Sequence, residues 1–122
     1  MGGGRRAAAL AADCLTAMAR IGRHVTRLSG YAPALPTPFT DEGAIDGPAF
    51  ERLCDLQIAA GAGALVVGGT TGEASMLTTQ EHAELIRIAV ARSRGCVPII
   101  AGAGGNATAH AIELTRGCRS SR

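Results

Sequence analysis

The residues best suited to chemistry lie in one glycine-rich stretch, residues 68–73 (GGTTGE). Its glycines let a ligand approach the backbone closely, and the hydroxyls of Thr70 and Thr71 can each donate and accept a hydrogen bond. Amides and hydroxyls together suit a carboxylate or a phosphate. The alternative is a turn whose threonines only cap the local backbone. Glu73 is a candidate general base, and the alternative is that it is a solvated or capping carboxylate.

A second glycine-rich stretch, residues 102–107 (GAGGNA), fits the G-x-G-x-x-A pattern of a dinucleotide-binding turn. That kind of site needs a carboxylate about 20 residues later to bind the ribose. Glu113 is the last acidic residue of the sequence, so this carboxylate is missing. The stretch therefore favours a close turn between a strand and a helix over a nucleotide site.

The sequence contains no lysine, and its cysteines and histidines are widely spaced, which excludes lysine chemistry and argues against a metal site. All 12 basic residues are arginine, so these 122 residues supply neither a Schiff-base lysine nor a P-loop lysine. The cysteines show no C-x-x-C spacing and the histidines are dispersed, so we predict no metal site. Their positions are Cys14, Cys54, Cys96, Cys118, His24, His82 and His110.

Three short apolar segments are predicted strands: residues 31–39 (YAPALPTPF), 64–67 (ALVV) and 97–101 (VPIIA). Helical patterns separate and follow them. Continuous apolar strands joined by helices indicate an α/β fold whose parallel sheet is covered on both faces or closed into a barrel. In both cases chemistry gathers at the carboxyl ends of the strands, so the loops that follow the strands are the informative segments.

The helical patterns have clear starts and stops. The first begins at Pro48, which suits a first helical position, and stops at Gly61. The second begins at Thr78, which is spaced as a capping box with Glu81. The third covers residues 108–116.

Composition restricts the class of protein. The hydrophobic content of 47% and the charged content of 18% predict a folded domain of ordinary size. Aromatic residues make up 2% and the net charge is +2, so we expect no nucleic-acid partner. No apolar run approaches the ~18 residues that a membrane-spanning helix needs, so we expect no membrane partner either.

Residues 1–30 differ from the rest of the chain. They are rich in Ala and Arg, and five arginines against Asp13 give a net charge of +4. An organellar transit peptide has this composition, and a solvated or mistranslated leader is the alternative. The long apolar core of a secretory signal is missing, so we expect a cytoplasmic protein and leave this leader out of the predicted fold.

Three segments of the sequence closely resemble a known family. Residues 34–46 (ALPTPFTDEGAID), 64–82 (ALVVGGTTGEASMLTTQEH) and 97–115 (VPIIAGAGGNATAHAIELT) are similar to successive strand, loop and helix segments of the dihydrodipicolinate synthase/N-acetylneuraminate lyase family. The resemblance implies the first three βα units of a TIM (β/α)8 barrel, truncated. Residues 31–116 would form this amino-terminal part, and the tail 117–122 no longer resembles the family.

The resemblance also implies an activity. In this family a lysine forms a Schiff base with pyruvate, and an aldol condensation with an aldehyde, or its release, follows. Thr71 matches the residue that holds the pyruvate carboxylate, with Gly72 beside it, and Thr70 matches a proton relay between two tyrosines. The double threonine favours the synthase branch, which joins pyruvate to aspartate semialdehyde in lysine and diaminopimelate biosynthesis. No cofactor is implied, and full-length relatives are expected to be homotetramers.

The departures from the family pattern are as informative as the match. The family's Schiff-base lysine, its general acid/base tyrosine and its aldehyde-binding arginine fall beyond these residues. Tyr31 precedes the first strand and can replace neither tyrosine. A frameshift or a truncated gene model accounts for this most simply, and we expect the chain alone to be inactive. The alternatives are a sialic-acid lyase or sugar-acid aldolase of the same family and a non-catalytic βα interaction fragment.

A regulatory site is also implied by the resemblance. His82 and Asn106 match two residues of a pocket in which lysine acts as a feedback inhibitor, at a dimer interface. Lysine-sensitive members usually place a glutamate at position 110, where this chain has His110. We therefore expect weak or absent inhibition by lysine in a full-length version. The alternative is that His110 is an exposed helix residue with no ligand nearby.

Overall fold

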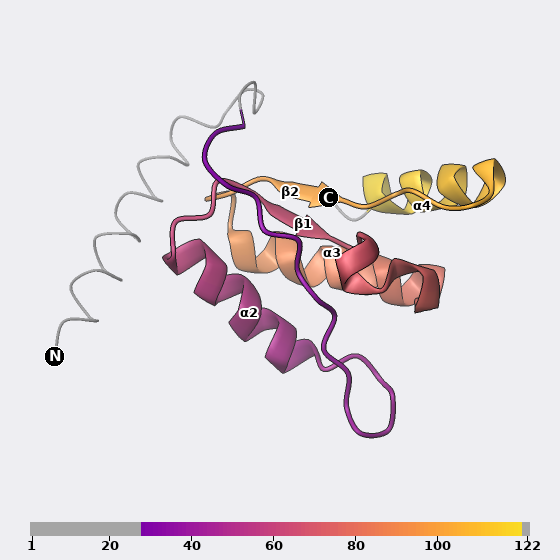
Figure 1. Ribbon diagram of the computed structural model, residues 1–122, viewed down its shortest axis with the longest axis horizontal. Coiled ribbons are helices and arrows are strands. Elements are labelled where there is room, and N and C mark those ends of the chain that lie inside the picture. Colours follow the sequence, from indigo (N-terminus) through magenta and orange to yellow (C-terminus); the bar gives the residue numbers. More distant parts are fainter. Residues whose placement is uncertain (1–27, 121–122) are drawn as a thin grey trace, which may run out of the picture.

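The computed structural model describes residues 28–120, and residues 1–27 of the predicted leader lie outside this part. Its helices are α2 (Gly47–Ala59), α3 (Thr79–Ser93) and α4 (Thr108–Ser120), and its strands are β1 (Leu65–Val67) and β2 (Ile99–Ala101) (Figure 1). Two 3₁₀ turns, η1 (Thr70–Gly72) and η2 (Ala74–Met76), follow β1. The predicted alternation of strand and helix is confirmed for β1, β2 and the three helices.

The sheet is parallel, with Leu65 paired to Ile99 and Val67 to Ala101. The predicted strand over residues 31–39 is wrong in its extent, because only Ala34 of this segment bridges to the sheet, at Val66 of β1, while Phe39 forms a separate antiparallel bridge to Ile45. Prolines at positions 33 and 36 carry no N–H group and cannot extend a ladder of hydrogen bonds. Three parallel segments therefore lie side by side in chain order: residues 33–35, β1 and β2.

The helix starts follow local capping chemistry. The Asp46 carboxylate accepts a hydrogen bond from the Ala49 amide at 2.9 Å, at the start of α2. At the start of α3, Thr78 Oγ1 accepts from the Glu81 amide at 3.2 Å, while Glu81 Oε2 accepts from the Thr78 amide at 2.8 Å. The predicted capping box is confirmed. Helix α4 continues to Ser120, past the predicted end at 116, because one glycine in a helix costs only about 1 kcal/mol and does not break it.

One core lies between the sheet and the helices. Helices α2 and α3 lie side by side on one face of the sheet, and α4 packs against α3 (Figure 1). The core consists of Leu35, Phe50, Cys54, Ala62, Leu65, Val67, Leu77, Leu85, Ile86 and Ala89. Burial raises the pKa of the Cys54 thiol to about 11, so this thiol stays protonated at neutral pH and packs as a small apolar group.

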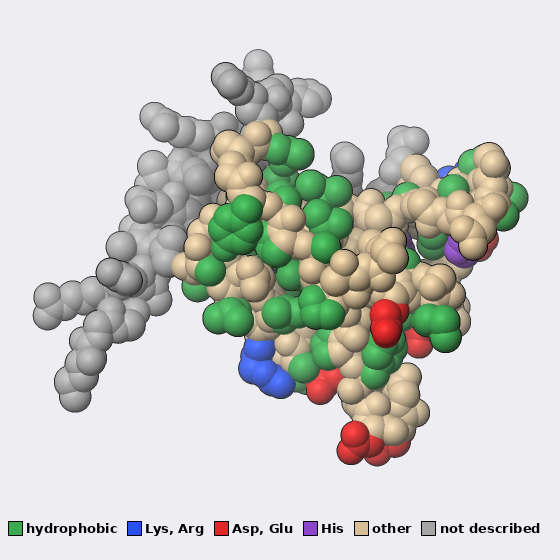
Figure 2. All heavy atoms as spheres, viewed as in Figure 1, with side chains coloured by type: hydrophobic (Ala, Val, Ile, Leu, Met, Phe, Trp, Pro, Cys, Tyr) green, Lys and Arg blue, Asp and Glu red, His purple; other side chains and the backbone are tan. Residues whose placement is uncertain are grey.

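The other side of the sheet is less covered. All three residues of β2 are half-buried, since the described residues give this strand a neighbour on one side only. Figure 2 shows hydrophobic side chains gathered across the middle of the face that residues 28–46 cross. A helix on one face and a barer opposite face is the arrangement of a barrel wall. None of the described helices is long and apolar enough to span a membrane.

Candidate active site

Three loops meet at the carboxyl ends of the parallel segments. Thr37, just after residues 33–35, donates a hydrogen bond from Oγ1 to the Gly72 carbonyl at 2.6 Å. The Gly102 amide, just after β2, donates to the Val67 carbonyl at 2.8 Å. These contacts confirm the prediction that the loops after the strands share one edge of the sheet.

The loop after β1 is a pair of 3₁₀ turns joined at Glu73. The Gly72 amide donates to the Gly69 carbonyl and the Glu73 amide to the Thr70 carbonyl, both at 3.0 Å. Glu73 takes a left-handed conformation with φ of 56°, which costs energy for any residue with a Cβ. Such strain persists where surrounding contacts hold it, and it is common at functional sites.

This loop presents Thr70 and Thr71 outward. Both residues are exposed, whereas Gly72 beside them is buried. Within the described residues, the backbone amides and hydroxyls of the two threonines donate to no partner. Unengaged amides next to exposed hydroxyls form a set of donors that an anionic group such as a carboxylate can accept from.

A buried histidine ties the two glycine-rich loops together. His82 of α3 is 3% exposed, and its Nε2 lies 2.6 Å from the Gly102 carbonyl oxygen. A Cβ added at Gly68, which has φ of +68°, would lie 2.5 Å from His82 Nε2. One added at Gly102 would overlap the Gly68 carbonyl. Both glycines are therefore required by the close approach of the two loops, and the predicted close turn at residues 102–107 stays a prediction.

The other two residues of the predicted regulatory pocket lie elsewhere on the surface. Asn106 and His110 are exposed, and His110 Nδ1 is 3.9 Å from Glu113 Oε2, an ion pair only when the imidazole is protonated. No hydrogen bond or ion pair within residues 28–120 joins His82 to Asn106 or His110. The pocket of His82, Asn106 and His110 thus stays a prediction, and His82 is buried inside the fold.

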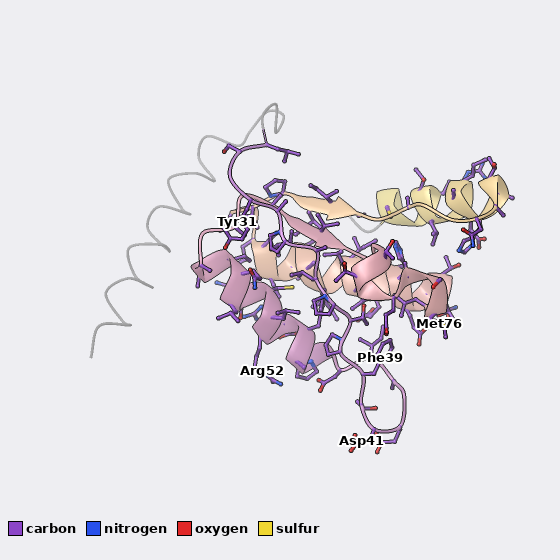
Figure 3. The ribbon with its side chains drawn as sticks, viewed as in Figure 1. Tyr31, Phe39, Asp41, Arg52 and Met76 are labelled. Atoms are coloured by element: carbon purple, nitrogen blue, oxygen red, sulfur yellow. The ribbon has the colours of Figure 1, made fainter. Side chains whose placement is uncertain are left out.

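Tyr31 lies far from the threonine loop. Its carbonyl accepts a hydrogen bond from the Gly63 amide at 2.8 Å, and Gly63 precedes the amino end of β1. Figure 3 shows Tyr31 on the left of the fold, well apart from Met76 on the right, with Phe39 on the side of Met76. Tyr31 therefore cannot serve as an acid or base at the carboxyl edge. Among the described residues, no group of three or more His, Cys, Asp and Glu side chains could hold a metal ion.

Sequence reasoning missed Thr37 as a site residue. Only its position suggested a role, because it is a polar residue between two prolines directly after an apolar segment. Its partner Gly72 is 35 residues away, so no local pattern predicts the bond.

A family model, curated relatives and solved structures all place the chain in the same family. The model of the Dihydrodipicolinate synthetase family matches residues 27–121. A 4-hydroxy-tetrahydrodipicolinate synthase of Albidiferax ferrireducens is 48% identical over 91 residues, which cover 75% of this chain and 31% of that protein. The chain thus spans about a third of the length of the curated relatives it matches.

Two solved structures show the same fold. The dihydrodipicolinate synthase of Acinetobacter baumannii, complexed with pyruvate, is 37% identical with a TM-score of 0.75, over 78% of this chain and 33% of that one. The enzyme of Cyanidioschyzon merolae with lysine bound is 36% identical with a TM-score of 0.72, over 77% and 32%. The predicted fold class, the first βα units of a (β/α)8 barrel, is confirmed.

Proposed function

The chain belongs to the dihydrodipicolinate synthetase family, and on that premise we propose that residues 68–72 bind the pyruvate carboxylate in a 4-hydroxy-tetrahydrodipicolinate synthase. The observation that carries this proposal is the outward presentation of Thr70 and Thr71 at the carboxyl edge of the sheet, with their amides and hydroxyls unengaged within the described residues. The pyruvate complex of the Acinetobacter baumannii relative supports the choice of ligand.

Each threonine has its own role in the proposal. The Thr71 hydroxyl and amide donate to the pyruvate carboxylate, and the buried Gly72 beside it lets the turn pack closely against residues 35–37. The Thr70 hydroxyl accepts one proton and donates another, which suits a relay between groups supplied by the rest of the barrel.

The nucleophile comes from outside these 122 residues. Imine formation needs a primary amine that adds to the pyruvate ketone with loss of water, and the sequence contains no lysine. In the proposed reaction the carbon nucleophile derived from pyruvate then adds to the aldehyde of aspartate semialdehyde. We infer that the chain alone is inactive and that the complete enzyme is a cytoplasmic homotetramer. It uses no cofactor.

We also propose that the loop after β2 contributes to a lysine-binding pocket. His82 holds that loop at Gly102, and the exposed Asn106 and His110 follow on it and on α4. The lysine complex of the Cyanidioschyzon merolae relative supports the choice of ligand. Because His110 offers no negative charge to an ammonium group, binding is weak.

A chimeric barrel tests the proposed function. In it, residues 28–120 of this chain replace the matched residues of the Albidiferax ferrireducens synthase. We expect condensation of pyruvate with aspartate semialdehyde, and a KM for pyruvate at least about tenfold higher in Thr71→Val, because a hydrogen bond to a charged group is lost. Thr71→Ser keeps the hydroxyl and should keep the KM. Thr115→Val, on exposed α4, is the matched control.

The remaining outcomes separate the alternatives. Activity with sugar acids and not with aspartate semialdehyde would assign the chain to another aldolase of the family. A folded chimera that acts on neither would favour the non-catalytic interaction fragment. For the chain alone, borohydride with pyruvate should trap no adduct. A stoichiometric adduct at any residue other than the terminal amine would contradict the lysine-dependent mechanism.

A further inference from the structure

We propose that Thr37 is a positioning residue for the turn that carries Thr70 and Thr71. Its hydroxyl donates to the Gly72 carbonyl and so sets the orientation in which the turn meets a carboxylate. The inference rests on the proposed function for the identity of the ligand, and on the geometry alone for the contact.

The hydrogen bond is short and shielded from water. The distance from Thr37 Oγ1 to the Gly72 carbonyl oxygen is 2.6 Å, and Thr37 is only 8% exposed. A buried carbonyl that loses its donor also loses access to water as a replacement. The fit is tight as well, since a Cβ added at Gly72 would lie 3.0 Å from the Leu35 carbonyl and 3.3 Å from Thr37 Oγ1.

This bond controls the peptide plane that closes the turn. The Gly72 carbonyl and the Glu73 amide belong to one planar peptide group, so fixing the first fixes the second. The Glu73 amide donates to the Thr70 carbonyl at 3.0 Å, which closes η1. The strained left-handed conformation of Glu73 is thus held from one side by Thr37.

Thr37 also gives the turn a second point of attachment. The chain around it is fixed to β1, because the Leu35 amide donates to the Val66 carbonyl at 2.9 Å. The turn itself leaves β1 at Gly68. The first and second βα units therefore hold the turn together, and donors placed in advance bind an anion without a cost of rearrangement.

Hydrogen exchange of the whole chain, read by mass spectrometry at residue level, tests this role. We expect Thr37→Val, a nearly isosteric change, to speed exchange of the Gly72 and Glu73 amides about tenfold, the factor expected for one lost hydrogen bond. Thr37→Ser should restore slow exchange. Thr115→Val makes the same substitution and removes an exposed hydrogen bond to the Ala111 carbonyl, and it should leave exchange of residues 68–77 unchanged.

Pyruvate distinguishes a positioning role from a purely structural one. In the chimeric barrel, millimolar pyruvate should slow exchange of the Thr70 and Thr71 amides, and in its Thr37→Val variant this protection should be lost while α3 exchanges as before. Unchanged exchange at Gly72 and Glu73 in Thr37→Val would overturn the proposal, as would uniformly faster exchange across β1 and α3. Absence of pyruvate protection in the chimeric barrel that carries the unmodified residues would instead contradict the proposed function, because exchange of the whole chain without pyruvate tests the role of Thr37 by itself.

Discussion

The loop after β1 and the loop after β2 stand at the same edge of the sheet and are held very differently. The first is fixed by Thr37 from the preceding unit, by its own 3₁₀ hydrogen bonds and by the capping box at Thr78. The second is bound at Gly102, and residues 104–109 after it are exposed. A Cβ added at Gly104 would meet nothing within 4 Å.

The difference shows that the described residues hold the loop after β1 in one geometry, whereas they leave most of the loop after β2 exposed. Segments with few buried contacts open at low free energy, whereas a turn held from several elements keeps one geometry. The turn that carries Thr70 and Thr71 is therefore held entirely by contacts among the described residues. The proposed lysine pocket has its anchor, His82, but its exposed members Asn106 and His110 need further groups to enclose a ligand.

The largest effect is expected where the two loops touch. In Gly102→Ala the new Cβ overlaps the Gly68 carbonyl, a backbone atom that cannot move cheaply. We expect a loss of about 3 kcal/mol in the free energy of unfolding, measured by urea denaturation. Gly104→Ala adds the same methyl group in open space and should change stability by less than about 0.5 kcal/mol. Equal effects of the two substitutions would contradict the contact between the loops.

The second comparison is between the buried His82 and the exposed His110, each replaced by alanine. His82→Ala leaves the Gly102 carbonyl without its partner and opens a cavity beneath both loops, so we expect a loss of about 2 kcal/mol in the free energy of unfolding. His110→Ala, on the exposed start of α4, should stay within about 0.5 kcal/mol. The same urea titrations measure both. A smaller effect at His82 than at His110 would show that the buried ring does not hold the loops.

Local signals in the sequence predicted a large part of this structure. The capping box of Thr78 and Glu81 is a pattern of four consecutive residues, and it formed as predicted. The segments 64–67 and 97–101 are apolar and flanked by glycines, and both contain strands at the predicted places. The glycine-rich loops after them lie at one edge because parallel strands require it.

The missed features depend on residues far apart in the chain. The end of the segment 31–39 as a strand follows from its local prolines, which cannot extend a ladder of hydrogen bonds, but its pairing of Ala34 with Val66 joins residues far apart in the chain. The burial of His82 depends on Gly68 and Gly102, which lie in two other segments. The Thr37 hydroxyl finds its acceptor at Gly72, and a one-dimensional pattern contains no such information.

The third prediction addresses the ligand of the loop after β2. In the chimeric barrel, His110→Glu should strengthen inhibition by lysine about tenfold, because a carboxylate can pair with the ammonium group of the ligand. Ile112→Glu adds the same charge at another exposed position of α4 and should not do so. The inhibition constant for lysine measures both. Inhibition of the unmodified chimera at sub-millimolar lysine would show that the interpretation of His110 is wrong.

The smallest effect is expected at the capping box, which joins the well-held loop after β1 to α3. Thr78→Ala should cost about 1 kcal/mol at pH 7, the usual effect of removing a threonine N-cap. Hydrogen bonds from the Thr78 amide and hydroxyl lower the pKa of Glu81, so its charge stabilises the fold above the ordinary glutamate pKa of about 4.3. This contribution disappears as the pH falls through the lowered pKa.

The stability difference between Thr78→Ala and the unmodified chain, followed by urea denaturation from pH 7 to pH 3, should therefore shrink. The control Thr79→Ala, one position into the helix, should give a small difference that stays constant with pH. A Thr78→Ala difference that stays constant to pH 3 would show that the hydrogen bond from the Thr78 hydroxyl to the Glu81 carboxylate contributes nothing to this end of the loop.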